Sequence, residues 1–281
     1  MKIEKKIIGN LEKCYALAPL TYQGKPHMLV AAEKVNQCLL YDLEGNLCDI
    51  VWEEPGGTMS MVQVPGSDGQ FIATHKFYSP NDSKEAKLVL ASPTDHGWEI
   101  KTLAKLPFVH RFDIITRNGT DYIIACTLKS GHEYKEDWRF PGKIQVCVLP
   151  KDLSCVNEEN PLEFYVIKEN LLKNHGYTKT EIDGIDRAVV ASNEGVFCVT
   201  PPKSQEGDWT IEHLIEEPSS DAVLVDFDND GEKEMLTISP FHGDQIHIFK
   251  KKDGEYHKIY TYDRKIEFAH AIWGGEICGR Q

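Results

Sequence analysis

The chain has 281 residues, and 41% of them are hydrophobic, so it can bury a large core within one domain. Its 44 Asp and Glu outnumber 31 Lys and Arg, and the net charge of −13 repels nucleic-acid phosphates and anionic lipid headgroups. No segment approaches the ~20 consecutive apolar residues of a membrane-spanning helix. We therefore expect a soluble, cytoplasmic protein with neither nucleic acid nor a membrane as its partner.

The eight cysteines are scattered without a CxxC pair, and most of them lie in alternating apolar runs. A thiol in such a run serves as a small hydrophobic side chain. We expect reduced, buried cysteines, as is usual in a cytoplasmic protein.

Short runs of alternating apolar residues, separated by turn residues, recur from end to end, whereas helical periodicity is almost absent. The runs fall into units of four. The first runs of successive units begin at residues 14, 58, 110, 175, 221 and 269. This interval of roughly 50 residues is close to the ~40–50 residues of a propeller blade.

This order predicts an all-β fold, a β-propeller with five complete four-stranded blades and the first strand of a sixth at 269–275. A large β-sandwich would explain the strands but not their fixed order of four. The sixth-blade strand has no sheet partners in the chain. We expect one propeller domain over 1–281 that is incomplete at its C-terminus, in a six- or seven-bladed ring completed by further chain or by another copy.

Residues 226–234, between the first and second strands of the fifth blade, carry four carboxylates and a glycine at position 231. The carboxylates are Asp226, Asp228, Asp230 and Glu234. An EF-hand would need flanking helices and a Glu at the twelfth position, where Thr237 stands. The stretch is therefore either a different calcium loop or a turn in which Asp and Asn bond their own backbone.

This pattern resembles the D-x-D-x-D-G-x-x-D repeat of FG-GAP/VCBS-type propellers, with Glu234 where that family has Asp. The resemblance implies a calcium ion held by the four carboxylates. At the level of fold the chain is also similar to oligogalacturonate lyases and aldos-2-ulose dehydratase. Those sugar-acting propellers place histidines and a divalent metal in the central funnel, although no catalytic motif of either group matches here residue by residue.

Entries to first strands and ends of second strands share one face of a propeller, and five histidines occupy these positions. At ~3.3 Å per residue, the strand before His242 separates that side chain from the aspartate loop by roughly 25–30 Å. Neutral imidazoles bind divalent transition metals, so we expect zinc, manganese or iron with open positions for substrate. Each histidine alone is more often an ordinary strand-end residue. The expected ligands are His75, His110, His175, His242 and His270.

A metal on this face would polarise a carbonyl or carboxylate and stabilise the enediolate that forms when the adjacent carbon loses a proton. Candidate bases and clamps nearby are Lys76, Tyr78, Arg111, Lys129 and His132. Candidate sugar-binding residues, partly in a long insertion at 130–142, are Tyr134, Trp138, Tyr177 and Asn193.

The leading hypothesis is a metal-dependent carbon–oxygen lyase or dehydratase that acts on a small carbohydrate or sugar acid. The main alternative is a non-catalytic propeller that binds a protein or glycan on the same face. A metal-free glycosidase would use carboxylates such as Glu33, Glu194 and Asp244. The sequence has no P-loop, G-x-S-x-G or H-E-x-x-H motif, so nucleotide, serine-hydrolase and zincin chemistries lack support.

Overall fold

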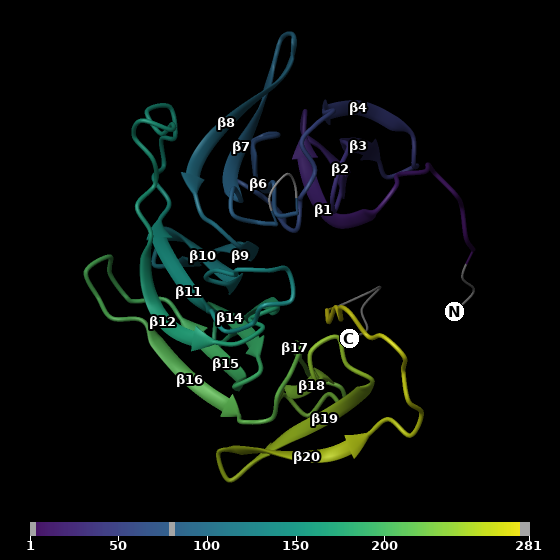
Figure 1. Ribbon diagram of the computed structural model, residues 1–281, viewed down its shortest axis with the longest axis vertical. Helices are drawn as coiled ribbons and strands as arrows, with labels where there is room; N and C mark the ends of the chain where they lie inside the picture. Colours follow the sequence, from purple (N-terminus) through teal and green to yellow (C-terminus); the bar gives the residue numbers. More distant parts are fainter. Residues whose placement is uncertain (1–3, 79–81, 276–281) are drawn as a thin grey trace. The chain divides into compact units, whose positions relative to one another are not determined.

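The computed structural model describes residues 4–78 and 82–275, which contain strands, turns and loops but no helix. Twenty strands form five antiparallel sheets of four, and in each sheet the strands pair in sequence order (Figure 1). This is the strand order of propeller blades, so the predicted fold class is confirmed.

The first two sheets are formed by the N-terminal part of the chain. The first consists of β1 (Cys14–Tyr22), β2 (Lys25–Ala32), β3 (Cys38–Asp42) and β4 (Leu47–Trp52). The second consists of β5 (Met61–Gln63), β6 (Phe71–His75), β7 (Lys87–Thr94) and β8 (Gly97–Lys105).

The remaining three sheets follow in chain order. The third consists of β9 (Val109–Arg117), β10 (Thr120–Lys129), β11 (Pro141–Val148) and β12 (Tyr165–Leu171). The fourth consists of β13 (Gly176–Ile182), β14 (Ile185–Ser192), β15 (Gly195–Thr200) and β16 (Thr210–Ile215). The fifth consists of β17 (Asp221–Val225), β18 (Glu234–Ser239), β19 (Gln245–Lys252) and β20 (Glu255–Thr261).

The run at 269–275, expected to open a sixth blade, forms no strand. It is an irregular segment, tied by a hydrogen bond from the Ala269 amide to the Gly243 carbonyl (2.9 Å). The Ile272 amide also donates to a carboxylate oxygen of Asp221 (3.2 Å). Its alternating apolar residues suit a strand, but a strand also needs a neighbour to satisfy its backbone, and none pairs with it among the described residues.

The chain divides into two compact units, and a single domain therefore stays a prediction. The first unit contains residues 1–109 and 152–163, and the second contains 110–151 and 164–281. In the first unit the two sheets share a core in which Leu29 and Leu40 pack with Phe71 and Val89. Burial of these apolar faces is the main favourable term in folding.

In the second unit β14 is buried on both faces. Ala188 and Val190 belong to the core shared with β9–β12, whereas Val189 and Ala191 belong to the core shared with β17–β20. Alternate residues of a strand point to opposite faces, so a strand packed on both faces reads as a continuous apolar run. This explains the sequence AVVA at 188–191.

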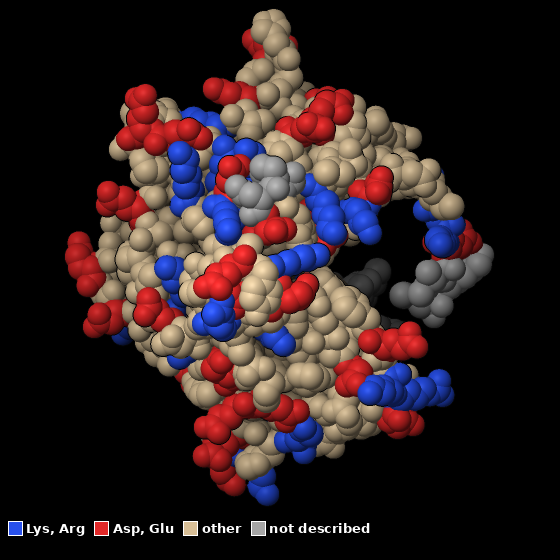
Figure 2. All heavy atoms as spheres, viewed as in Figure 1, with Lys and Arg blue, Asp and Glu red and all other residues tan. Residues whose placement is uncertain are grey.

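Figure 2 shows Asp and Glu interspersed with Lys and Arg on the surface of one face. No helix within the described parts of the chain is long and apolar enough to cross a membrane. The seven described cysteines are free thiols, and four of them are buried, whereas Cys14, Cys48 and Cys155 are exposed. Cys278 lies outside the described residues.

Replacing Phe71 with alanine should lower stability strongly, because its fully buried ring packs on Trp52 and Trp98 with 5.9 Å between ring centroids. We expect a loss of about 3–5 kcal/mol in the free energy of unfolding, measured by urea denaturation. Leu17→Ala is the control, since Leu17 is 64% exposed and its loss should cost less than about 0.5 kcal/mol. Equal effects of the two changes would contradict this account of the core.

Candidate functional site

Four of the five predicted histidines lie together in the second unit. His110 is near the start of β9, and His175 immediately precedes β13. His242 follows the end of β18, and His270 lies in the final irregular segment. Their ring centroids are 4.6 Å apart for His110 and His175, 4.8 Å for His175 and His242, and 5.0 Å for His175 and His270.

One nitrogen from each of His175, His242 and His270 lies within 4.8 Å of the other two. The Nε2 atoms of His175 and His242 are 3.3 Å apart. Zinc–nitrogen bonds of 2.0–2.1 Å place donor atoms about 3.3 Å apart in a tetrahedral site. The side chains of these three residues could therefore hold a metal ion after a small movement of His270.

Ser220 orients two of these histidines, although no sequence pattern marks this residue. Its carbonyl lies 3.1 Å from Nδ1 of His175, so Nδ1–H donates there and Nε2 has its lone pair available. Its hydroxyl accepts a hydrogen bond from the His242 amide (3.1 Å). A backbone φ of 48° at His242 turns the chain back at this point.

Burial keeps the imidazoles neutral. His110 and His175 are 2% and 1% exposed, and loss of hydration holds the pKa of each well below its ordinary value. Burial lowers the pKa of His242 to about 4, and the charges of His270 and Lys173 add to this effect. Neutral imidazole is the form that binds metals.

Aromatic rings line the histidine cluster. Phe241 stacks on His242 with centroids 4.0 Å apart and meets His175 edge-on at 5.4 Å. Phe268 lies 4.9 Å from His242, and Trp138 meets Phe241 at 5.4 Å. Trp138, predicted to bind a sugar, is thus one ring away from the histidines.

Lys173 is a further cation of this site, although it follows no blade pattern in the sequence. Its ammonium lies 5.1 Å from the ring centroid of Phe241 and 5.6 Å from that of Trp138. It makes no hydrogen bond or ion pair with the residues that the structure describes. A half-buried ammonium beside aromatic rings and neutral imidazoles is well placed to attract an anionic group.

Lys129, a predicted base, holds the insertion at 130–142 in place. It is 7% exposed, and its ammonium donates to the carbonyls of Lys135 and Asp137 at 3.1 Å each. It also lies 4.0 Å from the Trp138 ring centroid. The Asp137 carboxylate in turn binds Arg139. Within this insertion His132 is half-buried, whereas Tyr134 is 61% exposed.

Arg111 and Asp221 are two charged residues beside the segments that carry the histidines. The cation of Arg111 lowers the pKa of His110 and His175. Asp221 is 4% exposed, and burial raises its pKa to about 7, an effect that Arg111 opposes. The Asp221 carboxylate accepts the Ile272 amide and thereby fixes the segment that carries His270.

Two predicted sugar-binding residues, Tyr177 and Asn193, belong to β13 and to the turn after β14. Tyr177 packs against the core shared by β9–β12 and β13–β16, and its hydroxyl is buried. Burial raises the pKa of that hydroxyl well above its usual value. Asn193 is exposed in the turn after β14, and its amide donates to the Leu172 carbonyl (2.9 Å).

The other predicted rim residues belong to the first unit. His75 is 2% exposed at the end of β6, with its ring 4.5 Å from that of Trp52. Burial lowers its pKa to about 3, and the positive charges of Lys87 and Lys76 also contribute to this lowering. Lys76 pairs with Glu85 at 3.3 Å, and burial raises the pKa of Tyr78. The second unit alone supplies the four-histidine cluster.

The aspartate loop lies between β17 and β18, as predicted. Asp226 accepts the amides of Asp230 (3.1 Å) and Gly231 (3.0 Å), and Gly231 has a φ of 91°. The Lys250 ammonium contacts three of the carboxylates, at 2.6 Å from Asp228, 2.6 Å from Asp230 and 3.1 Å from Glu234. A calcium ion would have to displace this ammonium, so the calcium site stays a prediction.

No family profile matches the chain, and no curated protein matches it in sequence. Among solved structures, the β-propeller domain of Cps50 (Swd1) from Myceliophteria thermophila is similar, with a TM-score of 0.53 and 13% identity. The match covers 92% of this chain and 75% of that domain.

A mutant of the Synechocystis apocarotenoid oxygenase has a TM-score of 0.51 and 14% identity. That match covers 90% of this chain, which spans only 62% of the oxygenase. Likeness at such low identity defines the fold alone. The chain is thus an all-β protein of propeller blades, with a histidine cluster in its second unit.

The depressed histidine pKa values predict a loss of stability at acidic pH. Between the folded pKa and the unfolded value of ~6.5, the unfolded chain binds more protons, so lowering the pH favours unfolding. Asp221 acts in the opposite direction, because its folded pKa is raised. We therefore expect His175→Asn to show a smaller fall in melting temperature than wild type between about pH 7.5 and 5.

The control for this measurement is His257→Asn, because His257 is exposed on β20. It should show the wild-type pH dependence in the same thermal melts. A slope unchanged by His175→Asn would mean that this histidine is not held neutral by the fold.

Proposed function

We propose that the histidine cluster binds a divalent transition metal, namely zinc, manganese or iron, and catalyses elimination or dehydration of a carbohydrate or sugar acid. The observation that carries this proposal is the convergence of ring nitrogens from His175, His242 and His270 within 4.8 Å of one another. Three histidines with an open fourth position are the ligand set of catalytic zinc sites.

The surroundings of the cluster support metal binding. The Ser220 carbonyl fixes the tautomer of His175, as the hydrogen-bond partners of metal-binding histidines do. Burial keeps the imidazoles neutral, so no proton must leave before an ion enters. Phe241 and Phe268 shield the rings from bulk water on their apolar sides.

The chain's own groups suit an elimination. A bound divalent ion would supply Lewis acidity toward a carbonyl or carboxylate oxygen of the substrate. His110, the fourth histidine, is a neutral but weakly basic imidazole beside His175, and it could accept the proton from the carbon next to that group because a bound divalent ion would acidify this carbon. The electron pair of that carbon–hydrogen bond forms the new double bond, and the carbon–oxygen bond on the neighbouring carbon breaks. The departing oxygen leaves as water or an alcohol after taking up the proton that His110 accepted.

Substrate binding falls to the aromatic and cationic side chains beside the histidines. The indole of Trp138 offers a face for a sugar ring, and Lys129 holds that indole in place. The Lys173 ammonium and the Arg111 guanidinium can attract a carboxylate, which favours a sugar acid over a neutral sugar. The similarity to solved propellers supports only the fold, so the proposed reaction is argued from these side chains alone.

A second candidate function is binding without catalysis. It is favoured by the insertion at 130–142, where Tyr134 is 61% and Phe140 is 38% exposed on a loop anchored by Lys129 and Asp137. Exposed aromatic side chains on a fixed loop suit recognition of a glycan or protein. The two candidate functions differ in whether the histidines are needed, since catalysis requires them and binding through the insertion does not.

Protein purified without a polyhistidine tag should contain ~1 transition-metal ion per chain, measured by plasma mass spectrometry. The double variant His175→Ala and His242→Ala removes two of three converging nitrogens, so it should lose the metal and all turnover. The matched control is His96→Ala with His257→Ala, which changes two exposed histidines. Anomalous scattering at the metal edges would locate the ion among the three rings.

The proposed metal site would be contradicted if the protein took up no metal on reconstitution, or if the double variant retained its metal. Loss of metal without loss of glycan or protein binding would favour the second candidate.

Lys173→Met should raise KM for acidic sugars roughly 10–100-fold, because a hydrogen bond to a charged group contributes about 1.5–3 kcal/mol. The assay follows the ultraviolet absorbance of unsaturated products from oligogalacturonates and from neutral 2-keto sugars. Neutral substrates should be little affected, and Lys173→Arg should restore most of the loss. The control is Lys252→Met at an exposed position. An equal loss on acidic and neutral substrates would contradict carboxylate recognition by Lys173.

A further inference from the structure

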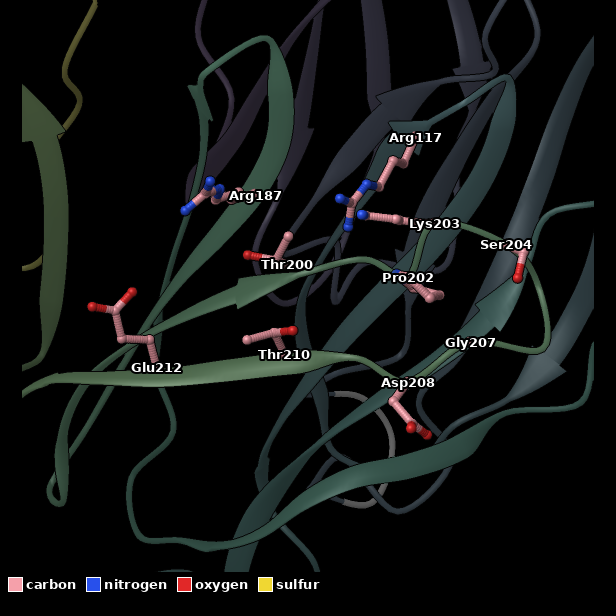
Figure 3. A pocket seen from close by; sticks show the side chains of 10 residues that line it. All are labelled: Arg117, Arg187, Thr200, Pro202, Lys203, Ser204, Gly207, Asp208, Thr210 and Glu212. Atoms are coloured by element: carbon pink, nitrogen blue, oxygen red, sulfur yellow. The ribbon is translucent and has the colours of Figure 1, made fainter.

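A polar pocket of about 500 Å³ lies in the second unit between the end of β9 and the strands β14 to β16 (Figure 3). Its lining includes Arg117, Arg187, Lys203, Thr200, Ser204 and Thr210. A volume of this size lies within the range of small-molecule sites, ≈ 300–1,000 Å³.

The pocket is separate from the histidine cluster. Arg117 ends the strand that His110 opens, and at ~3.3 Å per residue these two positions are roughly 23 Å apart. Arg187 lies near the start of β14, whereas Ala191, near its other end, pairs with Gly176 beside His175. The pocket and the histidines therefore occupy opposite ends of the same strands.

The cations of this pocket have unused hydrogen-bonding capacity. Arg117 donates through one guanidinium nitrogen to the Pro201 carbonyl, which fixes its position. Nε of Arg187 is buried without a hydrogen-bond partner in the described part of the chain. The nearest carboxylate to Arg187, that of Asp183, is 3.8 Å away. A buried donor without a partner costs ~1–3 kcal/mol, so it points to a ligand that the donor would bind.

Lys203 adds a third positive charge. Its backbone is held by a hydrogen bond from the Asn118 amide to its carbonyl (3.0 Å). Its ammonium makes no hydrogen bond or ion pair with the residues described in the structure. In Figure 3 the charged ends of Lys203 and Arg117 point toward each other, whereas the Asp208 carboxylate points away from both. Two cations that face each other repel unless an anion lies between them.

We propose that this pocket binds a small phosphorylated sugar. Arg117 and Lys203 would hold the phosphate, since guanidinium and ammonium groups are the usual phosphate ligands, whereas the Arg187 guanidinium points away from these two side chains in Figure 3. The hydroxyls of Thr200, Ser204 and Thr210 line the same space, and so do the carboxylates of Asp208 and Glu212. Carboxylates repel a second phosphate but accept hydrogen bonds from sugar hydroxyls, so one phosphate on a polyol fits the lining best.

The test is isothermal titration calorimetry of the full chain at constant ionic strength. The probes are glucose 6-phosphate, inorganic phosphate and glucose. We expect glucose 6-phosphate to bind most tightly, inorganic phosphate more weakly and glucose not measurably. Lys203→Gln, at an exposed position that tolerates substitution, should weaken glucose 6-phosphate binding about tenfold or more, and Arg117→Gln should do the same.

The control is Lys252→Gln, which removes one exposed charge from the same unit and should leave the affinity unchanged. Thermal melts of each variant establish that it is folded. Absence of binding by both phosphate probes would overturn the proposal, as would full affinity in Lys203→Gln. Equal affinities for inorganic phosphate and glucose 6-phosphate would overturn the assignment of a sugar.

Discussion

The packing of β14 between two neighbouring sheets is the constraint on which the second unit depends. Val189 and Val190 are adjacent in sequence, yet they belong to cores on opposite faces of the strand. A slip of one residue would exchange the two faces, so the register of β14 is strongly specified. The register in turn places Gly176 opposite Ala191 and fixes His175 at the entrance to β13. The hydrophobic packing of β14 thus determines the position of the His175 imidazole, although that ring contributes little to the packing.

A close backbone contact between Gly176 and the segment Ser220–Asp221 brings the histidine-bearing segments together. A Cβ on Gly176 would lie 2.7 Å from both Cα of Asp221 and the carbonyl oxygen of Ser220, so only glycine lets the two strand entries approach this closely. The short segment from Ser220 to Asp221 then contacts all three segments that carry the converging histidines. Ser220 binds the ring of His175 and the amide of His242, and Asp221 holds the segment that carries His270. Three histidines distant in sequence are positioned by two neighbouring polar residues.

Sequence pattern predicted the blades and the histidines for a shared reason. Both features recur once per blade. Each strand shows period-two alternation, and His110 and His175 occupy equivalent positions at the entries to first strands. Ser220, Asp221 and Lys173 follow no such pattern, since their roles arise from contacts with residues tens of positions away. The role of Lys129 could not be predicted for the same reason, because its ammonium donates hydrogen bonds to carbonyls of an irregular insertion. The segment at 269–275 has the composition of a strand, but pairing depends on a neighbour that composition does not supply.

Cations that face other cations or aromatic rings stand out in a chain with 44 Asp and Glu to 31 Lys and Arg. Lys250, Lys258 and Lys265 each contact a carboxylate within 2.7 Å. Lys173 and Lys203 do not, within the described residues, and each faces other positive or aromatic groups instead. Like charges gathered in an acidic protein raise its energy unless a ligand neutralises them. The negative net charge disfavours large polyanions at long range, whereas a small anion that enters between such cations meets a strong local attraction. Carboxylate and phosphate groups on small molecules therefore fit these two positions better than any extended polyanion.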